Sequence, residues 1–191
     1  MKGVVFNLLE QLVSRDYGED TWDDLLDEAG LDGAYTSLGS YDDADLFHLV
    51  GAASTSLDIS PDDLVRWFGR NSLPLFADSY PQFFAPHTSA RTFVLTLNDI
   101  IHPEVRKLYP GADVPEFDFE LGPDRDQGPL RMGYRSQRRL CSFAEGLIEG
   151  AAQHYGERAE IRQPTCMKLG DEQCLLEISF ETGDAGLVPG Q

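Results

Sequence analysis

The sequence has few cysteines and no long hydrophobic run. Its three cysteines, Cys141, Cys166 and Cys174, are an odd number, which argues against a disulfide framework and favours a reducing compartment. No segment approaches the roughly 20 apolar residues that a membrane span needs, and no secretory signal precedes the first amphipathic pattern. We therefore expect a cytoplasmic protein.

Basic residues are also scarce. The chain has 33 acidic residues against 15 basic ones, of which only Lys2, Lys107 and Lys168 are lysines, and its formal net charge is −18. A surface this acidic repels phosphate backbones and anionic lipid headgroups, so we expect neither a nucleic acid nor a membrane as partner. This excess of acidic residues and shortage of lysines fits either a high-salt habitat or a GC-rich genome, and it does not indicate a particular function.

What remains is the composition of one globular domain. The 191 residues are 41% hydrophobic and 25% charged, which is enough to build a sizeable core. No internal repeat and no shift in composition divides the chain. We expect one domain over residues 1–181, with a helical lobe over about 1–60, a second lobe over about 61–181 and a loose tail over 182–191.

Apolar residues recur at helical spacing through the first two thirds of the chain. The pattern predicts helices over residues 4–13, 22–29 and 42–54, and a further helix from Ser60 through Phe68. We also expect a short apolar helix over 73–84, interrupted by a proline. The run over 89–102 is apolar on nearly every side, which predicts a helix buried between others.

The hydrophobic period changes after Pro115. Residues 117–121 alternate between apolar and acidic side chains, and residues 130–134 alternate again beyond a turn over 122–128, which is typical of a β-hairpin. A helix with one apolar face over 140–151 follows, and residues 159–168 and 173–180 predict a second hairpin. The sequence therefore predicts an α+β fold, in which a helical amino-terminal lobe packs on a lobe containing a four-stranded antiparallel sheet with helices.

Three polar residues stand two positions apart: Tyr134, Ser136 and Arg138. On an extended segment, side chains at this spacing point to the same face. Two hydroxyls and a guanidinium in a row can bind one or two carboxylates, the guanidinium through two parallel hydrogen bonds. A strand end with ordinary polar residues would show the same spacing, so the row alone does not establish a site.

His102 closes the most apolar predicted helix, so among the four histidines its imidazole is the one expected to face a buried pocket. A neutral imidazole there can bind iron or zinc, although a core histidine bonded to a backbone carbonyl would fit the same pattern. Together with the carboxylate-binding row and the apolar surroundings, this histidine meets the needs of a non-covalent b-type haem. Covalent attachment of a c-type haem is excluded, because no Cys-x-x-Cys-His motif is present.

On these landmarks the sequence resembles the haem nitric oxide/oxygen-binding (H-NOX) family, bacterial relatives of the haem domain of soluble guanylate cyclase. The resemblance covers residues 1–180 and includes the stretch 146–150. It implies a haem between the two lobes, with His102 as the proximal iron ligand and Tyr134, Ser136 and Arg138 as the propionate clamp. It also implies that Pro115 presses on the porphyrin and that Asp45 pairs with the clamp arginine.

The resemblance also bears on which gas is bound. Oxygen-binding members of the family place a tyrosine hydroxyl over the iron, and in this chain that position is Phe143, while the amino-terminal distal position is Leu9. Bound oxygen needs a hydrogen-bond donor nearby, whereas nitric oxide and carbon monoxide need one far less. An apolar wall of Val5, Leu9 and Phe143 therefore indicates a sensor of nitric oxide, also open to carbon monoxide, that excludes oxygen.

The signalling mechanism implied by the resemblance is mechanical. Nitric oxide weakens the bond between the iron and His102 until it breaks or shifts, the haem relaxes against Pro115, and the helix carrying His102 moves. We expect no enzymatic activity, because the sequence has no nucleophile–base–orienter set and no phosphate loop. The signal then needs a separate effector, which in bacterial relatives is usually a histidine kinase or a cyclic-di-GMP enzyme.

Some members of the family hold a zinc ion with three cysteines and a histidine. Cys141, Cys166 and Cys174 match the cysteine positions, but the histidine position is Gln163, a poor zinc ligand. Three reduced thiols are the alternative. Two other functions stay open at this point: a haem-free module that binds a small acidic or apolar ligand, and a zinc- or thiol-based redox switch.

Overall fold

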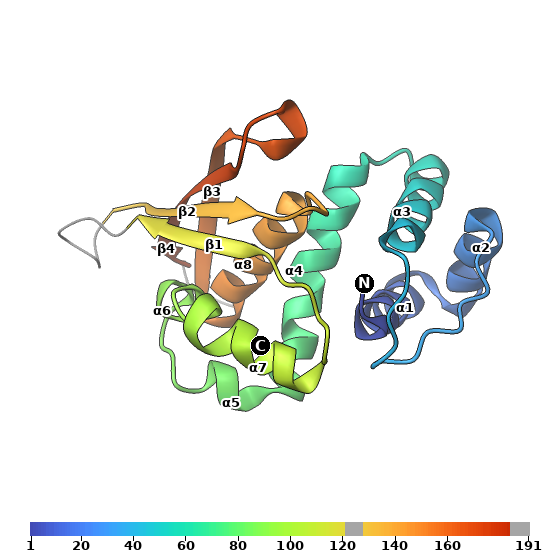
Figure 1. Ribbon diagram of the computed structural model, residues 1–191, viewed down its shortest axis with the longest axis horizontal. Helices are drawn as coiled ribbons and strands as arrows, with labels where there is room; N and C mark the ends of the chain where they lie inside the picture. Colours follow the sequence, from blue (N-terminus) through green and yellow to red (C-terminus); the bar gives the residue numbers. More distant parts are fainter. Residues whose placement is uncertain (121–127, 184–191) are drawn as a thin grey trace, which may run out of the picture.

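Residues 1–120 and 128–183, which a computed structural model describes, form two lobes joined by one long helix (Figure 1). The first lobe is a helical bundle, and the second combines short helices with a β-sheet. The helices of the first lobe are α1 (Gly3–Tyr17), α2 (Glu19–Ala29) and α3 (Asp43–Leu57), and α4 (Pro61–Ser79) runs from this lobe into the second.

Each helix of the first lobe buries one apolar face, as its spacing predicts. Phe6 of α1 and Leu46 of α3 are at most 2% exposed and belong to the same buried cluster. At the start of α4, the hydroxyl of Ser60 accepts a hydrogen bond from the backbone N–H of Asp63, and Pro61 takes the first helical position. The three predicted helices of this lobe and the predicted start of α4 are confirmed.

The course of α4 corrects the prediction of two separate helices, one through Phe68 and one over 73–84. The helix continues through Pro74, whose missing N–H leaves the carbonyl of Arg70 without its helical partner. That carbonyl oxygen faces the long helix of the second lobe, since a Cβ added to Gly150 there would lie 2.6 Å from it. Close packing between the two helices thus supports α4 across its proline.

The chain between α4 and residue 108 also differs from the prediction of one buried helix over 89–102. After α5 (Pro81–Phe84), the chain forms α6 (Ala90–Val94), the π-helical turn η1 (Leu97–Ile101) and α7 (His102–Leu108). No residue of η1 is buried, and Ile100 is 47% exposed. Apolar side chains of this stretch, Leu97 among them, pack against the core and also line a cavity.

One antiparallel sheet confirms the two predicted hairpins and the α+β class. Its strands lie in the order β1-β2-β4-β3, and α8 packs against it. The predicted turn over 122–128 and the predicted tail over 182–191 fall almost wholly outside the described residues. The elements are β1 (Glu116–Glu120), β2 (Leu130–Arg135), α8 (Cys141–His154), β3 (Glu157–Thr165), η2 (Met167–Leu169) and β4 (Cys174–Thr182).

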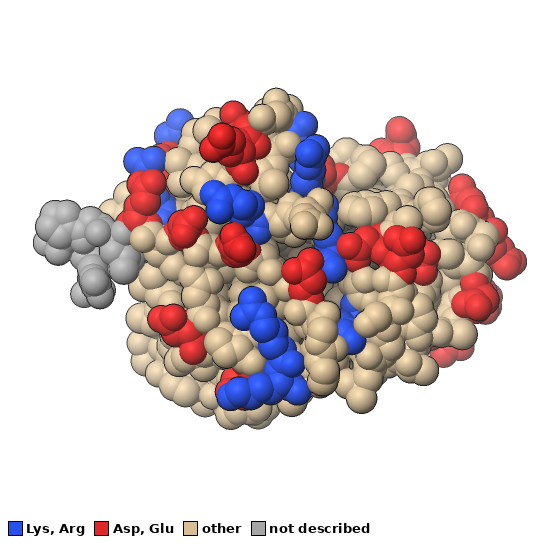
Figure 2. All heavy atoms as spheres, viewed as in Figure 1, with Lys and Arg blue, Asp and Glu red and all other residues tan. Residues whose placement is uncertain are grey.

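Acidic side chains dominate the surface of the first lobe. Lys2 and Arg15 are the only basic residues among the first 60. In the view of Figure 2, acidic groups are scattered over this lobe, while basic groups gather over the second lobe and along the seam between the two. Within residues 1–120 and 128–183, no helix combines the length and the apolar character needed to cross a lipid bilayer.

Candidate functional site

A cavity of about 410 Å³ lies between the two lobes. Its walls come from α1, α3 and α4 on one side and from α7, β1, β2 and α8 on the other. A volume of this order, mostly apolar with a few convergent polar groups, is typical of a site for a small molecule or cofactor. Apolar side chains from both lobes line it, among them Val5, Leu46, Phe68, Phe93, Met132 and Leu147.

His102, the first residue of α7, lines this cavity and is half-buried. Its imidazole stacks on the ring of Phe117, with ring centroids 5.3 Å apart and planes inclined by 25°. Burial, helped by the charge of Arg106, lowers the pKa of His102 to about 4, so the ring is neutral at pH 7. Among the described residues the imidazole has no hydrogen-bond partner, which leaves a ring nitrogen available to a metal.

The three residues of the polar row also line the cavity, at the end of β2. Tyr134 is 2% exposed, and burial raises its pKa to about 12, so the phenol is neutral. Ser136 and Arg138 follow in the turn before α8, where the Ser136 hydroxyl accepts a hydrogen bond from the Arg138 backbone N–H at 3.3 Å. The structure thus brings two hydroxyls and a guanidinium to one cavity. Pro115, directly before β1, lines the same cavity.

Two aspartates hold the side chain of Arg138. Its Nε donates to Asp43 Oδ2 at 2.8 Å, and its Nη1 donates to the backbone oxygen of Asp113 at 2.8 Å and lies 3.1 Å from the Asp113 carboxylate. The amino group of Met1 lies 2.7 Å from the other oxygen of Asp43. Burial opposes ionisation of Asp43, but hydrogen bonds from these two cations outweigh it and lower its pKa. The guanidinium is therefore fixed in position.

The pairing of Arg138 with Asp43 corrects the prediction of Asp45 as its partner. Asp45 instead lies 3.4 Å from the hydroxyl of Tyr35. Both aspartates belong to the first turn of α3. Residues two apart in a helix point about 200° away from each other, so only one of the two can face Arg138.

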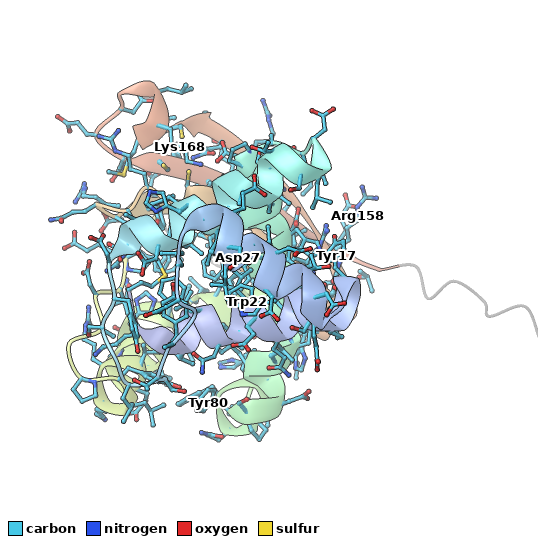
Figure 3. The ribbon with its side chains drawn as sticks, turned by 90° about the vertical axis from the view of Figure 1, so that its right-hand side faces the viewer. Tyr17, Trp22, Asp27, Tyr80, Arg158 and Lys168 are labelled. Atoms are coloured by element: carbon cyan, nitrogen blue, oxygen red, sulfur yellow. The ribbon has the colours of Figure 1, made fainter. Side chains whose placement is uncertain are left out.

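The predicted apolar wall is only partly assembled at this cavity. Val5 and Phe143 line it, and the Phe143 ring packs on Phe68 with centroids 5.0 Å apart. Leu9 is 7% exposed and lines a second cavity of about 200 Å³ in the first lobe. Tyr17, labelled in Figure 3, lines this second cavity as well. Phe68 lines both cavities and lies next to Phe143, a position that was not predicted from the sequence.

Further lining residues on α4 and at its end, which the sequence did not single out, are Leu73, Phe76 and Tyr80. With Phe68 they recur at helical spacing, which would have indicated one face of one helix. The break predicted between residues 68 and 73 assigned them to a different helix from Phe68 and concealed this pattern.

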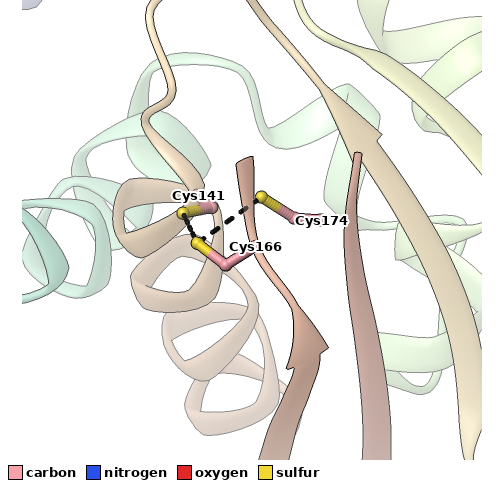
Figure 4. Close-up of side chains that lie close together, drawn as sticks. All are labelled: Cys141, Cys166 and Cys174. Carbon is pink, nitrogen blue, oxygen red and sulfur yellow. Dashed lines mark hydrogen bonds between the residues drawn. The ribbon is translucent and has the colours of Figure 1, made fainter. Parts of the chain in front are cut away.

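Three buried cysteines form a cluster of their own (Figure 4), and none of them is among the residues that line the large cavity. Cys141 begins α8, and its Sγ lies 3.8 Å from the Sγ of Cys166, which lies 4.0 Å from the Sγ of Cys174. All three thiols are free, and burial raises the pKa of Cys174 to about 12. The amide nitrogen of Gln163 is buried and has no hydrogen-bond partner among the described residues.

The donor groups of the large cavity suit a haem. A neutral imidazole on one wall can hold an iron atom, and the hydroxyls and guanidinium at the end of β2 can bind carboxylates. Most of the remaining lining is apolar, as a macrocycle requires. A family model described as Haem-NO-binding matches residues 2–163. The chain belongs to the haem-NO-binding family.

Solved structures of H-NOX proteins are similar to this haem-NO-binding chain over nearly its whole length. An H-NOX protein from Shewanella oneidensis in the Fe(II)NO ligation state is 34% identical, with a TM-score of 0.87, over 95% of this chain and 99% of that chain. Unliganded Fe(II) H-NOX from K. algicida is 29% identical, with a TM-score of 0.84, over 95% and 97% of the two chains.

A curated relative extends the similarity to guanylate cyclases. Soluble guanylate cyclase gcy-32 of Caenorhabditis elegans is 32% identical over 71 residues, which are 36% of this chain and 10% of that protein. The match therefore spans only a small part of the cyclase.

Proposed function

We propose that this protein is a haem-based sensor of nitric oxide, formed by one domain over residues 1–181, with His102 as the protein ligand of the iron. The observation that carries the proposal is that a neutral imidazole, which has no hydrogen-bond partner within residues 1–120 and 128–183, and a fixed guanidinium line the same mostly apolar cavity. A ferrous b-type haem would supply an iron atom with a coordination position open to a gas. Tyr134, Ser136 and Arg138 would hold its two propionates.

The side chains of the cavity support selection of nitric oxide and carbon monoxide over oxygen. Val5, Phe68 and Phe143 line it and have no hydrogen-bond donor in their side chains. Dioxygen depends on such a donor much more than the other two gases do. Met1, Val4 and Leu46 extend the lining in the first lobe with side chains that have no donor. Lys2 and Ser40, which also line the cavity there, do have donors, but they are bonded to each other, since the Lys2 Nζ donates to the Ser40 hydroxyl at 2.9 Å.

We also propose that the signal passes to a separate effector, of the histidine kinase or cyclic-di-GMP enzyme class. Movement of α7 relative to the sheet would be the change that the effector detects. Two features support this: His102 begins α7, and α7 has no buried residue that would lock it in the core. Such a response requires nitric oxide to favour one of two arrangements of the same segment.

An absorption spectrum of the reduced protein without oxygen, before and after addition of nitric oxide, tests the function. A five-coordinate ferrous Soret band that shifts with nitric oxide and does not change in air is expected. A chain that shows no Soret band even after reconstitution with haem would instead be a haem-free binding module. A stable spectrum of an oxygen complex would contradict the proposed gas selectivity.

Arg138→Leu is expected to speed haem loss by about tenfold. Two or more charge-assisted hydrogen bonds to a propionate would be lost, each worth about 1.5–3 kcal/mol when fully formed, although water would replace part of them. Transfer of haem to an apo-globin acceptor measures the rate. Arg135→Leu is the matched control, because that arginine lies three residues away, is exposed, and reaches Glu116 at 3.6 Å outside the cavity. Equal rates for both variants would remove Arg138 from the clamp.

We further propose that the cysteine cluster binds zinc. A tetrahedral zinc with Zn–S bonds of about 2.3 Å places its sulfur ligands about 3.8 Å apart. Two of the Sγ separations, 3.8 and 4.0 Å, are close to that value, and all three Sγ atoms lie within 4.8 Å of one another. Cys141, Cys166 and Cys174 would supply three ligands, and a water molecule the fourth.

Gln163→His is expected to tighten zinc binding by at least about tenfold, since a fourth protein ligand replaces water. Competition with a coloured zinc chelator measures the affinity. Cys174→Ser should lower the affinity at least as far, because a thiolate ligand is lost. If neither substitution changes the affinity, the metal is bound elsewhere. If the wild-type protein takes up no zinc, the cluster is three reduced thiols, and reversible oxidation of them becomes the alternative to test.

A further inference from the structure

The segment that carries His102 has little buried packing to fix its position. Neither η1 nor α7 contributes a buried residue. A π-helical turn directly precedes His102, and such turns are rare and less favourable than α-helix. Pro103, which directly follows, has no N–H to donate to the preceding turn. The position of the imidazole therefore depends on contacts that the rest of the segment makes.

One such contact lies four residues before His102. The Nδ2 of Asn98 donates a hydrogen bond to the backbone oxygen of Phe117 at 2.8 Å. Phe117 is 8% exposed, belongs to β1, and pairs with Tyr134 of β2. Its ring is also the one on which His102 stacks. Asn98 therefore connects the start of the segment to the strand residue that contacts the imidazole.

A second contact lies seven residues after His102. The hydroxyl of Tyr109, which follows α7, lies 2.6 Å from the hydroxyl of Tyr80. Tyr80, labelled in Figure 3, stands at the junction of α4 and α5. Both tyrosines line the large cavity. Burial and this hydrogen bond raise the pKa of Tyr109 to about 12, so its phenol stays neutral across the physiological pH range. The end of the segment is thereby joined to the helix that connects the two lobes.

We propose that Asn98 and the Tyr80–Tyr109 pair are positioning residues that hold the two ends of residues 97–109 and so keep His102 at the cavity. The inference rests on the proposed function, because it takes His102 as the iron ligand. Without one of the two hydrogen bonds, the imidazole is held less firmly at the cavity and leaves the metal sooner. Since one hydrogen bond is worth about a two- to tenfold change in an equilibrium, the effect of each is measurable.

The chain supplies a matched control for each variant. Asn98→Ala is compared with Asn71→Ala, which removes another Nδ2 donor bonded to a backbone oxygen at 2.8 Å, that of Trp67. Tyr109→Phe is compared with Tyr155→Phe, which removes a hydroxyl that donates to the Phe84 backbone oxygen at 2.9 Å. Neither control residue lines the cavity or belongs to the segment.

The rate at which His102 leaves the iron after nitric oxide is added, followed by absorption in the haem-loaded protein, is the first measurement. We expect Asn98→Ala and Tyr109→Phe to raise this rate about two- to tenfold, with the iron–histidine stretching band lower in frequency or broader, and both controls to match the wild type. In the haem-free chain, amide hydrogens of residues 97–109 should exchange faster by a similar factor. Rates and bands equal to those of the controls would overturn the proposal.

The positioning role and the proposed haem function can be tested separately. If the wild-type protein loads haem and needs His102, but the Asn98 and Tyr109 variants behave as their controls do, only the positioning role is wrong. If the wild-type protein loads no haem, the proposed function is wrong. Hydrogen exchange then decides whether the segment is held at all, and unchanged exchange in both variants would overturn that as well.

Discussion

Replacing His102 with glycine is expected to lower the haem content of the purified protein at least about tenfold, a loss of 1.4 kcal/mol or more in binding free energy. No other histidine and no cysteine lies among the described residues that line the cavity, so no side chain of either type can take over the iron. The pyridine haemochrome assay measures the bound haem. Free imidazole added during expression should restore the content, because glycine leaves the space of the ring vacant.

The restored His102→Gly protein gives a second result. Its iron ligand is no longer joined to the chain, so nitric oxide should still shift the absorption band, while hydrogen exchange across residues 97–109 no longer responds to the gas. His87→Gly is the matched control, since His87 is also half-buried with a pKa lowered by burial, but lies outside the cavity lining. A His102→Gly protein that keeps a five-coordinate ferrous spectrum without imidazole would assign the iron ligand to another residue.

Local periodicity was sufficient for much of this fold because it depends on neighbouring residues only. Alternation predicted both hairpins, and helical spacing predicted α1, α2 and α3. The polar row could be predicted for the same reason, since Tyr134 and Ser136 are near in sequence and all three residues stay on one side of the chain as it leaves β2.

Contacts between distant segments explain where the predictions were wrong. The sequence predicted a break between residues 68 and 73, but α4 continues there and packs its Arg70 carbonyl against Gly150, 80 residues further along, a contact that local spacing does not reveal. The choice between Asp43 and Asp45 depends on how α3 is rotated toward Arg138, some 95 residues away. The π-helical turn η1 also contacts a distant segment, through the hydrogen bond from Asn98 to β1.

Leu9 does not belong to the wall that is proposed to face the gas. Because Leu9 lines the second cavity, the residue beside Phe143 is Phe68 of α4. The wall is nonetheless apolar, so the expected selectivity for nitric oxide depends on Val5, Phe68 and Phe143 instead of on the three residues named from the sequence. A hydroxyl introduced at one of these positions is the direct way to test that dependence.

Phe143→Tyr is expected to raise oxygen affinity about 10- to 100-fold, as a donor hydrogen bond to a partly charged acceptor is worth about 1.5–3 kcal/mol. Phe143 is half-buried and lines the cavity at the first turn of α8, so a hydroxyl on its ring extends the side chain without removing its contact with Phe68. Oxygen titration of the reduced protein by absorption gives the affinity. Carbon monoxide affinity, measured in parallel, should change much less.

Phe83→Tyr is the control for the same substitution at another position of the lining, on α5 beside Tyr80. It adds an equal hydroxyl to the cavity, so a rise in oxygen affinity with Phe143→Tyr alone would show that the position of the donor matters and not merely its presence. Equal rises in both variants would mean that any added polarity admits oxygen. No rise in either would mean that Phe143 does not face the gas, and the exclusion of oxygen would then have to come from the iron's bond to His102 and the shape of the cavity.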